Sequence, residues 1–337
     1  MEAIVLQEPE RFARIKLNVP GEPGPGEAVV RVRRIGICGT DLHAYRGNQP
    51  FFSYPRILGH ELGVELLAAG GQFDLKPGDR CAVEPYLNCG QCFACHIGKT
   101  NCCEKLAVLG VHVDGGMREL ITVPAAKLHK SEKLSLDQLA LVETLAIGAH
   151  AIARAEVRPG DWVLVIGAGP IGLAVMQFVR IAQARLIAMD LNAERLNFCR
   201  GQMEVEASIS NGERAVSILG EITNGQLPSV VFDATGDARS MKNAFQYVSH
   251  GGKLVFVGLV KGDISFDDPD FHRRELTLLS SRNSTSNDFI EIIHLIENGK
   301  IDTKPWITHR ADFGDLIEKF PSWLDPGNRV VKAMLEV

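Results

Sequence analysis

The sequence lacks several features that would place a protein in a well-defined class. It has no run of Lys and Arg that resembles a polybasic membrane signal, and its formal net charge of -5 with a pI near 6.1 argues against a large nucleic-acid-binding surface. Internal repeats and low-complexity tracts are also absent. Hydrophobic residues make up 45% and charged residues 23%, which are ordinary globular values and argue against disorder. The expected partner is therefore a small molecule.

A secretion signal and a long unbroken apolar run are lacking as well. The first residues include an acid and no basic stretch, so we expect a cytosolic protein. The stretch 162–179 is almost continuously apolar, but Gly167, Gly169, Pro170 and Gly172 interrupt it. Such interruptions are typical of a buried strand, a tight turn and a helix, and not of a membrane span.

What the sequence does contain is a group of metal-ligating residue types near position 40. Cys38, His60 and Glu61 offer a thiolate, an imidazole and a carboxylate, a mixed set that suits zinc with one position left for a substrate oxygen. Thr40 and His43 follow closely, where a hydroxyl and an imidazole can pass a proton to water. Any one of these residues is more often a packed core residue. Their combination favours an active site.

A second group of candidate ligands lies farther along the chain. Of eight cysteines, five fall between positions 89 and 103. Cys89, Cys92 and Cys95, with Cys102 or Cys103 as the fourth, are typical of a closed tetrahedral zinc site that stabilises a loop without its own core. Disulfides and a nucleic-acid zinc module are the alternatives, and the spacing alone does not choose between the last two cysteines.

The stretch 161–182 predicts a dinucleotide-binding turn. A buried strand leads into a glycine-rich turn and then a helical pattern, and the next strand ends at Asp190. Glycines let the backbone approach a pyrophosphate. An acid about twenty residues beyond the turn, as Asp190 is, binds ribose hydroxyls and repels a 2'-phosphate, so we expect NAD more than NADP. Arg195 is a candidate for stacking on the adenine. The expected cofactor-binding residues are Gly167, Gly169, Pro170, Ile171, Gly172, Asp190, Arg195, Thr235, Val257 and Gly258.

A chain of 337 residues is expected to form two domains. Residues 1–146 contain short alternating strands with frequent Gly and Pro, which predicts a β-rich, partly barrel-like domain. The stretch that follows alternates strands and helices, which predicts an α/β, doubly wound parallel sheet. Sheets of this kind often pair, so a homodimer or homotetramer is expected.

These motifs occur in the order typical of the zinc-dependent medium-chain alcohol and polyol dehydrogenases, which the chain resembles over its whole length. Residues 36–41 and 59–61, the four-cysteine lobe, Gly115-Gly116 and the dinucleotide turn carry the resemblance. It implies a GroES-like catalytic domain at 1–146 with a structural zinc lobe at 89–103, a Rossmann NAD-binding domain at 147–281, and a segment at 282–337 that completes the catalytic domain. It also implies two zinc ions per subunit and Cys103 as the fourth lobe ligand.

One position departs from the ethanol-type members, which have a second cysteine near the metal where this chain has Glu143. Sorbitol- and threonine-dehydrogenase-like members have glutamate there. The resemblance therefore implies Glu143 as a catalytic residue and zinc ligand, directly or through water, beside or in place of Glu61. Asp41 is expected to orient His60.

Three loops, at 47–56, 100–105 and 110–112, resemble family members that oxidise C5 of the sugar acids L-galactonate or L-gulonate to the keto acid. An acidic substrate needs a cation, and arginine binds carboxylates through two hydrogen bonds. Arg282 corresponds to a substrate-side arginine of the polyol enzymes, and Arg46 and Arg118 are further candidates. The alternatives are a neutral polyol or L-threonine as substrate, and a non-catalytic NAD- or zinc-binding sensor of the same fold.

Overall fold

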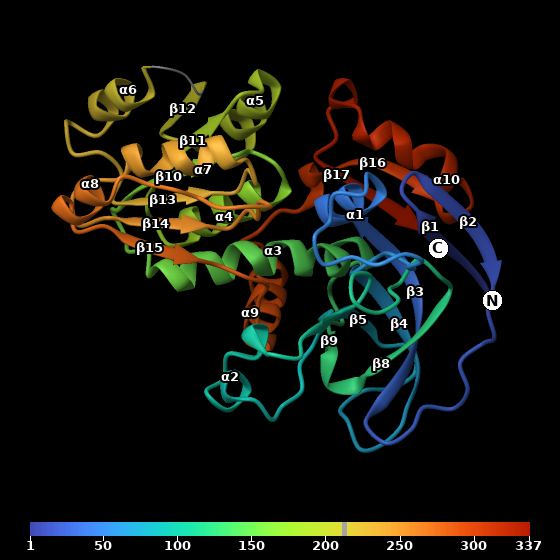
Figure 1. Ribbon diagram of the computed structural model, residues 1–337. Helices are drawn as coiled ribbons and strands as arrows, with labels where there is room; N and C mark the ends of the chain where they lie inside the picture. The colour runs from blue at the N-terminus through green and yellow to red at the C-terminus, as the bar shows by residue number, and fades with distance from the viewer. Residues whose placement is uncertain (211–213) are drawn as a thin grey trace. The chain divides into compact units, whose positions relative to one another are not determined.

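The computed structural model describes residues 1–210 and 214–337, and the chain divides into two compact units. The first unit consists of Met1–Thr144 and Thr285–Val337, and the second consists of Leu145–Ser284 (Figure 1). The sequence suggested boundaries at 146/147 and 281/282. Arg282 therefore falls in the second unit instead of the C-terminal segment.

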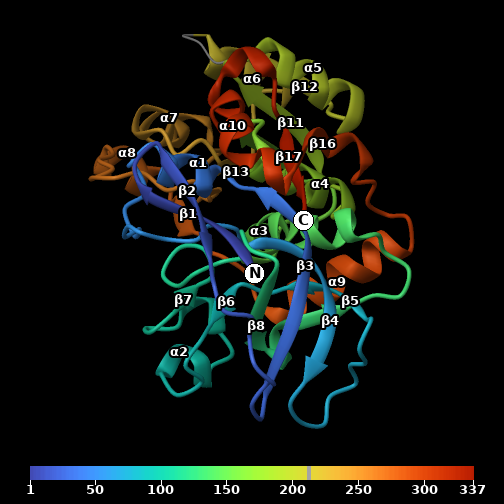
Figure 2. The same ribbon diagram turned by 90° about the vertical axis from the view of Figure 1, so that its right-hand side faces the viewer.

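The first unit is built on a mixed seven-stranded sheet with the order β16-β17-β3-β4-β5-β9, and β8 also pairs with β3. The C-terminal strand β17 (Lys332–Glu336) and strand β4 (Glu61–Ala69) both pair antiparallel with β3 (Glu27–Ile37), one on each side (Figure 2). Residues from the two ends of the chain therefore meet around the end of β3, directly before Cys38.

The remaining elements of the first unit, apart from the twelve-residue helix α9, are short. Its other strands are β1 (Glu2–Glu8), β2 (Arg11–Lys16), β5 (Arg80–Val83), β6 (Tyr86–Leu87), β7 (Ala107–Val108), β8 (Leu120–Pro124), β9 (Leu128–Lys130) and β16 (Ile307–Asp312). Its helices are α1 (Gly39–Tyr45), α2 (Phe93–His96), α9 (Ser286–Glu297) and α10 (Leu316–Lys319), with 3-10 turns η1 (Thr100–Cys102), η2 (Ala125–Lys127), η4 (Lys304–Trp306), η5 (Phe313–Asp315), η6 (Phe320–Leu324) and η7 (Pro326–Asn328). Helix α3 (Leu136–Ala155) begins in this unit and continues into the second.

The core of the first unit follows from the alternation of apolar residues along its strands. Ala28, Val30 and Val32 of β3 are fully buried, as period-two patterning of a strand that packs on one face requires. Helix α3 begins against β4 at Gly63, where an added Cβ would lie 2.2 Å from the carbonyl oxygen of Leu136. A glycine at this point lets the helix that carries Glu143 pack closely on the sheet.

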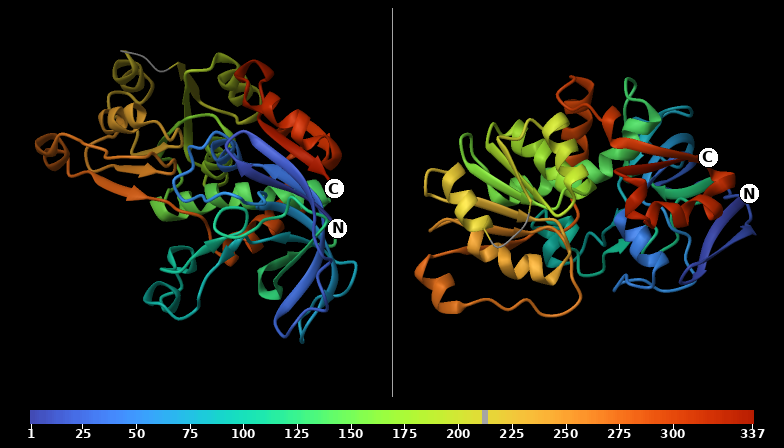
Figure 3. Two further views of the ribbon diagram at one scale, coloured as in Figure 1. Left: turned by 45° about the vertical axis from the view of Figure 1, so that its right-hand side comes forward. Right: turned by 90° about the horizontal axis from the view of Figure 1, so that it is seen from above.

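The second unit is a six-stranded parallel sheet with the order β12-β11-β10-β13-β14-β15 and helices on both of its faces (Figure 3). This order places the two strands that begin the two halves of the sheet, β10 and β13, side by side, as in dinucleotide-binding folds. The predicted α/β class and doubly wound sheet are confirmed. The strands are β10 (Trp162–Ile166), β11 (Arg185–Asp190), β12 (Ala207–Ser210), β13 (Val230–Asp233), β14 (Lys253–Phe256) and β15 (Thr277–Ser280). The helices are α4 (Pro170–Ile181), α5 (Ala193–Gln202), α6 (Ala215–Ile222), α7 (Ala238–Ala244) and α8 (Asp268–Arg273), with one 3-10 turn, η3 (Phe245–Tyr247).

One helix in the described part of the chain, α3, is long and apolar enough to cross a membrane by composition. Of its most apolar 18-residue window, 56% is buried inside the structure. This burial is how a core helix of a folded domain behaves. The apolar stretch at 162–179 forms β10, a turn and most of α4, as its glycines predict.

Candidate active site

Helix α1 brings three of the predicted site residues within two turns. Cys38 is its N-cap in an extended conformation, and its backbone N–H donates to Asp41 Oδ2 at 2.9 Å. This capping box fixes the start of the helix relative to the end of β3. Thr40 is half-buried and His43 is exposed. The ring of His43 is nevertheless partly shielded from solvent, and this shielding and the positive charge of Arg46 lower its pKa, so the ring is neutral and able to accept a proton at pH 7.

His60 and Glu61 reach Cys38 from the start of β4. The candidate ligand atoms of Cys38, His60 and Glu61 all lie within 4.8 Å of one another. His60 Nδ1 lies 3.7 Å from Asp41 Oδ1, and neither buried atom has a hydrogen-bond partner among the described residues. A ring whose other nitrogen binds a metal commonly gives its Nδ1–H to a carboxylate. The donor set and these two unpaired atoms fit zinc.

Glu61 is engaged by a residue that the sequence did not suggest, Lys332 of β17. The Lys332 ammonium donates to Glu61 Oε1 at 2.6 Å and to Oε2 at 2.7 Å, and both side chains are almost fully buried. Burial alone would raise the pKa of Glu61, but Lys332, His60 and the Thr144 hydroxyl together outweigh it, and the pKa lies below its ordinary value. Gly36 faces this pair, and a Cβ there would lie 2.1 Å from Glu61 Oε2. Glycine at position 36 thus leaves room for the ion pair.

Glu143 projects from α3 and is also buried, with 5% of its surface exposed. The hydroxyl of Tyr86 donates to its Oε1 at 2.5 Å. Burial raises the pKa of Glu143, and the charge of Glu61 acts in the same direction. Glu143 lies outside the compact group of three ligand atoms, but it is close enough for electrostatic interaction with both His60 and Glu61.

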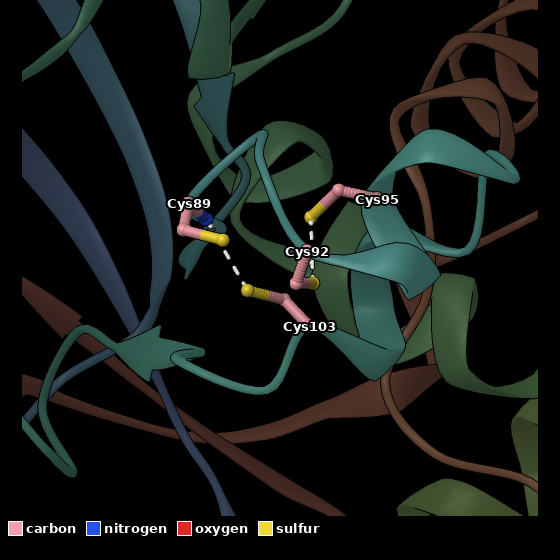
Figure 4. Close-up of side chains that lie close together, drawn as sticks. All are labelled: Cys89, Cys92, Cys95 and Cys103. Atoms are coloured by element: carbon pink, nitrogen blue, oxygen red, sulfur yellow. Dashed lines mark hydrogen bonds between the residues drawn. The ribbon is translucent and has the colours of Figure 1, made fainter.

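The cysteine lobe has the arrangement of a metal site. The sulfur atoms of Cys89, Cys92, Cys95 and Cys103 lie within 4.8 Å of one another and face a common centre (Figure 4). Backbone N–H groups point at these sulfurs, and those of Glu104 and Cys95 lower the pKa of the Cys92 thiol to about 6. The remaining candidate, Cys102, is exposed. The structure therefore brings Cys103 into the group and not its neighbour.

The glycine-rich turn joins β10 to α4 in the second unit. Gly167 has a positive φ of 94°, and a Cβ at Gly172 would lie 1.7 Å from the Gly167 carbonyl oxygen. Gly169 is the N-cap of α4, and an added Cβ there would meet nothing closer than 3.9 Å. The space beside Gly169 and the free N–H groups of the helix start are what a pyrophosphate requires. Pro170 and Ile171 form the first turn of α4.

Asp190 ends β11 beside this turn. Its Oδ2 accepts from the Ala168 backbone N–H at 2.6 Å and its Oδ1 from Asn192 at 2.7 Å. The carboxylate thus fixes the turn. Arg195 Nη1 lies 3.8 Å from Asp190 Oδ2, so its guanidinium pairs with the acid that we expected to bind the ribose.

Two loops at the carboxyl end of the sheet carry the other predicted cofactor residues. Asp233, at the end of β13, accepts from the backbone N–H of Thr235 at 2.9 Å and from its hydroxyl at 2.6 Å. The backbone N–H groups of Val257 and Gly258 donate to the Asp233 carbonyl oxygen. A Cβ at Gly258 would lie 2.4 Å from the Gly236 nitrogen, so glycine lets the two loops meet.

The three candidate substrate arginines differ in their surroundings. Arg46 follows α1, is exposed, and donates to the Leu324 carbonyl oxygen at 3.2 Å. Arg118 donates to the carbonyl oxygens of Gly115 at 3.0 Å and Asp114 at 3.3 Å, which gives its guanidinium a role in the loop. Arg282 is exposed in the connection that follows β15 in the second unit.

Sequence reasoning missed Lys332 and Tyr86. Lys332 precedes the apolar residues of β17, where a lone lysine among buried positions was the available signal of a buried partner for an acid. Tyr86 lies between a buried strand and the cysteine lobe, and nothing in its local pattern points to Glu143. Both contacts join segments far apart in the chain.

Comparisons with known proteins agree with this geometry. Residues 24–133 match the family model described as alcohol dehydrogenase GroES-like domain, and residues 170–298 match that described as zinc-binding dehydrogenase. The chain is 40% identical over 336 residues to L-galactonate-5-dehydrogenase of Escherichia coli K12, covering 99% of this chain and 98% of that protein. It is 33% identical over 330 residues to L-arabinitol 4-dehydrogenase of Aspergillus oryzae, covering 92% and 86%.

A solved structure extends the likeness to three dimensions. An alcohol dehydrogenase from Escherichia coli CFT073, solved with NADH, superposes with a TM-score of 0.92 at 31% identity, covering 100% of this chain and 99% of that one. Family, fold and candidate ligand set thus point the same way. The chain belongs to the zinc-dependent medium-chain alcohol dehydrogenases, enzymes that act on a CH–OH group.

Proposed function

We propose that this protein oxidises the C5 secondary hydroxyl of a sugar acid, L-galactonate or L-gulonate, to the keto acid with NAD as hydride acceptor. The observation that carries the proposal is the 40% identity to L-galactonate-5-dehydrogenase across almost the full length of both chains. The guanidinium of Arg46, directly after α1, supports an anionic substrate.

The site residues divide into a metal-binding group and a proton pathway. We assign Cys38 and His60 as zinc ligands, with Glu61 and Glu143 supplying carboxylate, directly or through water. Zinc bound there supplies Lewis acidity, which lowers the pKa of a coordinated hydroxyl. Cys89, Cys92, Cys95 and Cys103 hold the second, structural zinc.

The proton leaves through α1. The Thr40 hydroxyl accepts a hydrogen bond from the substrate hydroxyl, and His43, exposed and neutral at pH 7, passes the proton to solvent. Because His43 lies one helical turn after Thr40, the two side chains share one face of the helix. The route therefore runs from a half-buried hydroxyl to an exposed imidazole.

Arg46 is the arginine that we assign to the substrate carboxylate in the first unit. Its position directly after α1 keeps it close enough to His43 to influence the pKa of that ring. Arg282 remains a candidate through its correspondence to the polyol enzymes, whereas the backbone carbonyls that hold Arg118 make it the weakest of the three.

The carboxylate of Asp190 supports NAD over NADP, because a 2'-phosphate would meet its negative charge.

We also propose a homo-oligomer. Strand β15 is an edge strand of the parallel sheet, and Leu278 on it is 37% exposed, which suits pairing with a second copy. A cytosolic location agrees with thiols that serve as metal ligands.

An NAD-reduction screen tests the proposal. L-Galactonate, L-gulonate, sorbitol, xylitol, L-arabinitol and L-threonine are compared at equal concentration by absorbance of NADH. We expect the highest kcat/KM with a sugar acid, and Arg46→Gln to raise KM for that acid while leaving KM for any polyol unchanged. Turnover of neutral polyols without turnover of either sugar acid would overturn the acidic-substrate assignment and favour the polyol alternative.

A further inference from the structure

Tyr86 makes a buried hydrogen bond to one of the acidic residues of the site. Only 2% of Tyr86 and 5% of Glu143 are exposed, and the tyrosine hydroxyl donates to Glu143 Oε1 at 2.5 Å. A hydrogen bond to a charged acceptor in a buried site is among the stronger ones, and it restricts how the carboxylate can turn.

Both the backbone and the ring of Tyr86 are held in place by neighbouring elements. Its backbone pairs with Val108 in the short β6–β7 ladder. Its ring packs edge-on against Phe289 of α9, with centroids 6.5 Å apart and planes at 81°. Phe289 is fully buried and stacks in turn on His129 at 5.0 Å. A side chain with this support delivers its hydroxyl to a fixed point.

The segment that carries Tyr86 is anchored two residues earlier by Glu84, whose side chain is buried. His129 Nε2 lies 3.2 Å from Glu84 Oε2, the Ser286 hydroxyl donates to the same oxygen at 2.6 Å, and the Lys127 ammonium binds Oε1. These partners come from η2, β9 and the first turn of α9. The backbone N–H of Glu84 also donates to the Lys127 carbonyl oxygen. The chain before Tyr86 is thus fixed by a satisfied buried ion cluster.

Glu143 needs such a partner because its surroundings oppose a fixed, charged carboxylate. It is buried on α3, and the negative charge of Glu61 lies nearby. A long glutamate side chain has several rotamers available, and a single hydroxyl donor selects among them. We propose that Tyr86 is a positioning residue for Glu143, which it holds with one oxygen toward the Cys38–His60 group. This proposal rests on the proposed function in that it takes Glu143 as part of the zinc site.

The test compares Tyr86→Phe with Tyr247→Phe. Both substitutions remove one hydroxyl from a buried tyrosine, but Tyr247 lies in the core of the second unit. Zinc affinity is measured by competition with a chromophoric chelator, and ligand geometry by the visible spectrum of the cobalt-substituted protein. Cys38→Ser identifies which signal belongs to the catalytic site. We expect Tyr86→Phe to weaken metal binding there about 10- to 100-fold and to shift the cobalt bands, with the lobe signal unchanged. Tyr247→Phe should change neither.

A double-mutant cycle separates positioning from general destabilisation. If Tyr86 acts through Glu143, adding Tyr86→Phe to Glu143→Ala, which leaves the tyrosine hydroxyl no acceptor at position 143, should weaken metal binding far less than Tyr86→Phe alone. If Tyr86→Phe does not fold, Phe289→Leu gives a second route, because it keeps the Tyr86 hydroxyl but removes the ring that packs against Tyr86. We expect a smaller shift in the same direction.

Unchanged metal affinity and an unchanged cobalt spectrum in folded Tyr86→Phe would overturn the proposal, as would full additivity in the cycle. If Tyr86→Phe does not fold, an unchanged Phe289→Leu variant would do the same. None of these measurements uses a substrate, so failure to find the right sugar acid does not affect them. If no metal signal depends on Cys38, the zinc assignment itself fails and the positioning role fails with it.

Discussion

At the scale of single residues, the buried pair between Lys332 and Glu61 is the strongest constraint on the site. Taking two charges out of water is costly, and the cost is offset only when each charge is fully paired. Lys332 meets both Glu61 oxygens and also donates to the Thr144 hydroxyl at 3.2 Å and the Ile37 carbonyl oxygen at 3.3 Å. Every N–H of the ammonium therefore has a partner, and the negative charge of Glu61 is balanced by Lys332.

Lys332→Met should be strongly destabilising because it leaves the Glu61 carboxylate buried without its partner. We expect a loss of about 3–5 kcal/mol in the free energy of unfolding at pH 7, measured by urea denaturation of the metal-free protein. Lys130→Met is the matched control, since Lys130 pairs with Asp74, whose side chain is 90% exposed. The control should cost less than about 1 kcal/mol. Equal effects of the two substitutions would contradict the role given to Lys332.

The same pair predicts how stability depends on pH. The pKa of Glu61 is lowered in the folded protein, because Lys332, together with His60 and Thr144, outweighs the opposing effect of burial. Its contribution is therefore present above the pKa of a glutamate in the unfolded chain, 4.5, and is lost as the pH falls through the lower folded pKa. Between pH 7 and pH 3, the wild type should lose more stability than Lys332→Met. A parallel decline of both proteins would show that Glu61 is not the titrating group.

His43 gives a prediction about turnover. Burial and Arg46 lower the pKa of its ring, so the neutral form that accepts a proton persists into mildly acidic solution. His43→Ala should slow turnover most at low pH, on the order of 10²-fold, and added imidazole should restore part of the rate. The pH profiles of kcat with and without imidazole measure this. Equal activity, or no rescue of a slowed variant, would remove His43 from the proton pathway.

At the scale of elements, the turn between β10 and α4 contains glycines that are present for different reasons. Gly172 is required by packing, since a Cβ there would lie 1.7 Å from a backbone oxygen. Gly169 has open space beside it and an extended φ of -78° that any residue can adopt. The fold therefore does not require glycine at 169, and we infer that a bound pyrophosphate does.

Gly169→Ala should therefore affect cofactor binding, whereas Gly172→Ala should affect stability. We expect Gly169→Ala to melt close to the wild type but to bind NADH at least about 10-fold more weakly, because its methyl group occupies the pyrophosphate space. Gly172→Ala should lower stability by about 1–3 kcal/mol or more through overpacking. Thermal unfolding and a fluorescence titration with NADH distinguish the two. A Gly169→Ala protein that binds NADH normally would place the cofactor elsewhere.

The elements of the second unit were predictable because each has a local signal. Apolar runs, glycine turns and helical spacing lie within a few residues of one another, and β10, α4 and β11 formed where the pattern placed them. The capping of α1 by Asp41 is also local. The partners of the site acids were not predictable, because Lys332 and Glu61 lie 271 positions apart. Only the order of strands in the sheet brings them together, and a single sequence does not contain that order.

At the scale of the whole molecule, the first unit draws on both ends of the chain, and its last strand supplies the partner of Glu61. Strand β17 pairs with β3 directly before Cys38 and contributes Lys332. The two groups of candidate ligands within this unit differ in chemistry. The lobe offers four sulfurs and suits a closed site, whereas the group at Cys38 offers mixed ligands and suits an open one.

The most direct test of the account is the zinc content of the purified protein and of two variants, Cys38→Ser and Cys92→Ser, measured together with NAD-dependent activity. We expect about two zinc ions per chain in the wild type. Cys38→Ser should keep about one zinc and the wild-type fold while losing activity, and Cys92→Ser should lose the lobe zinc together with stability. A Cys38→Ser protein that keeps both zinc ions, or that keeps full activity, would contradict the assignment of a catalytic zinc to Cys38 and His60.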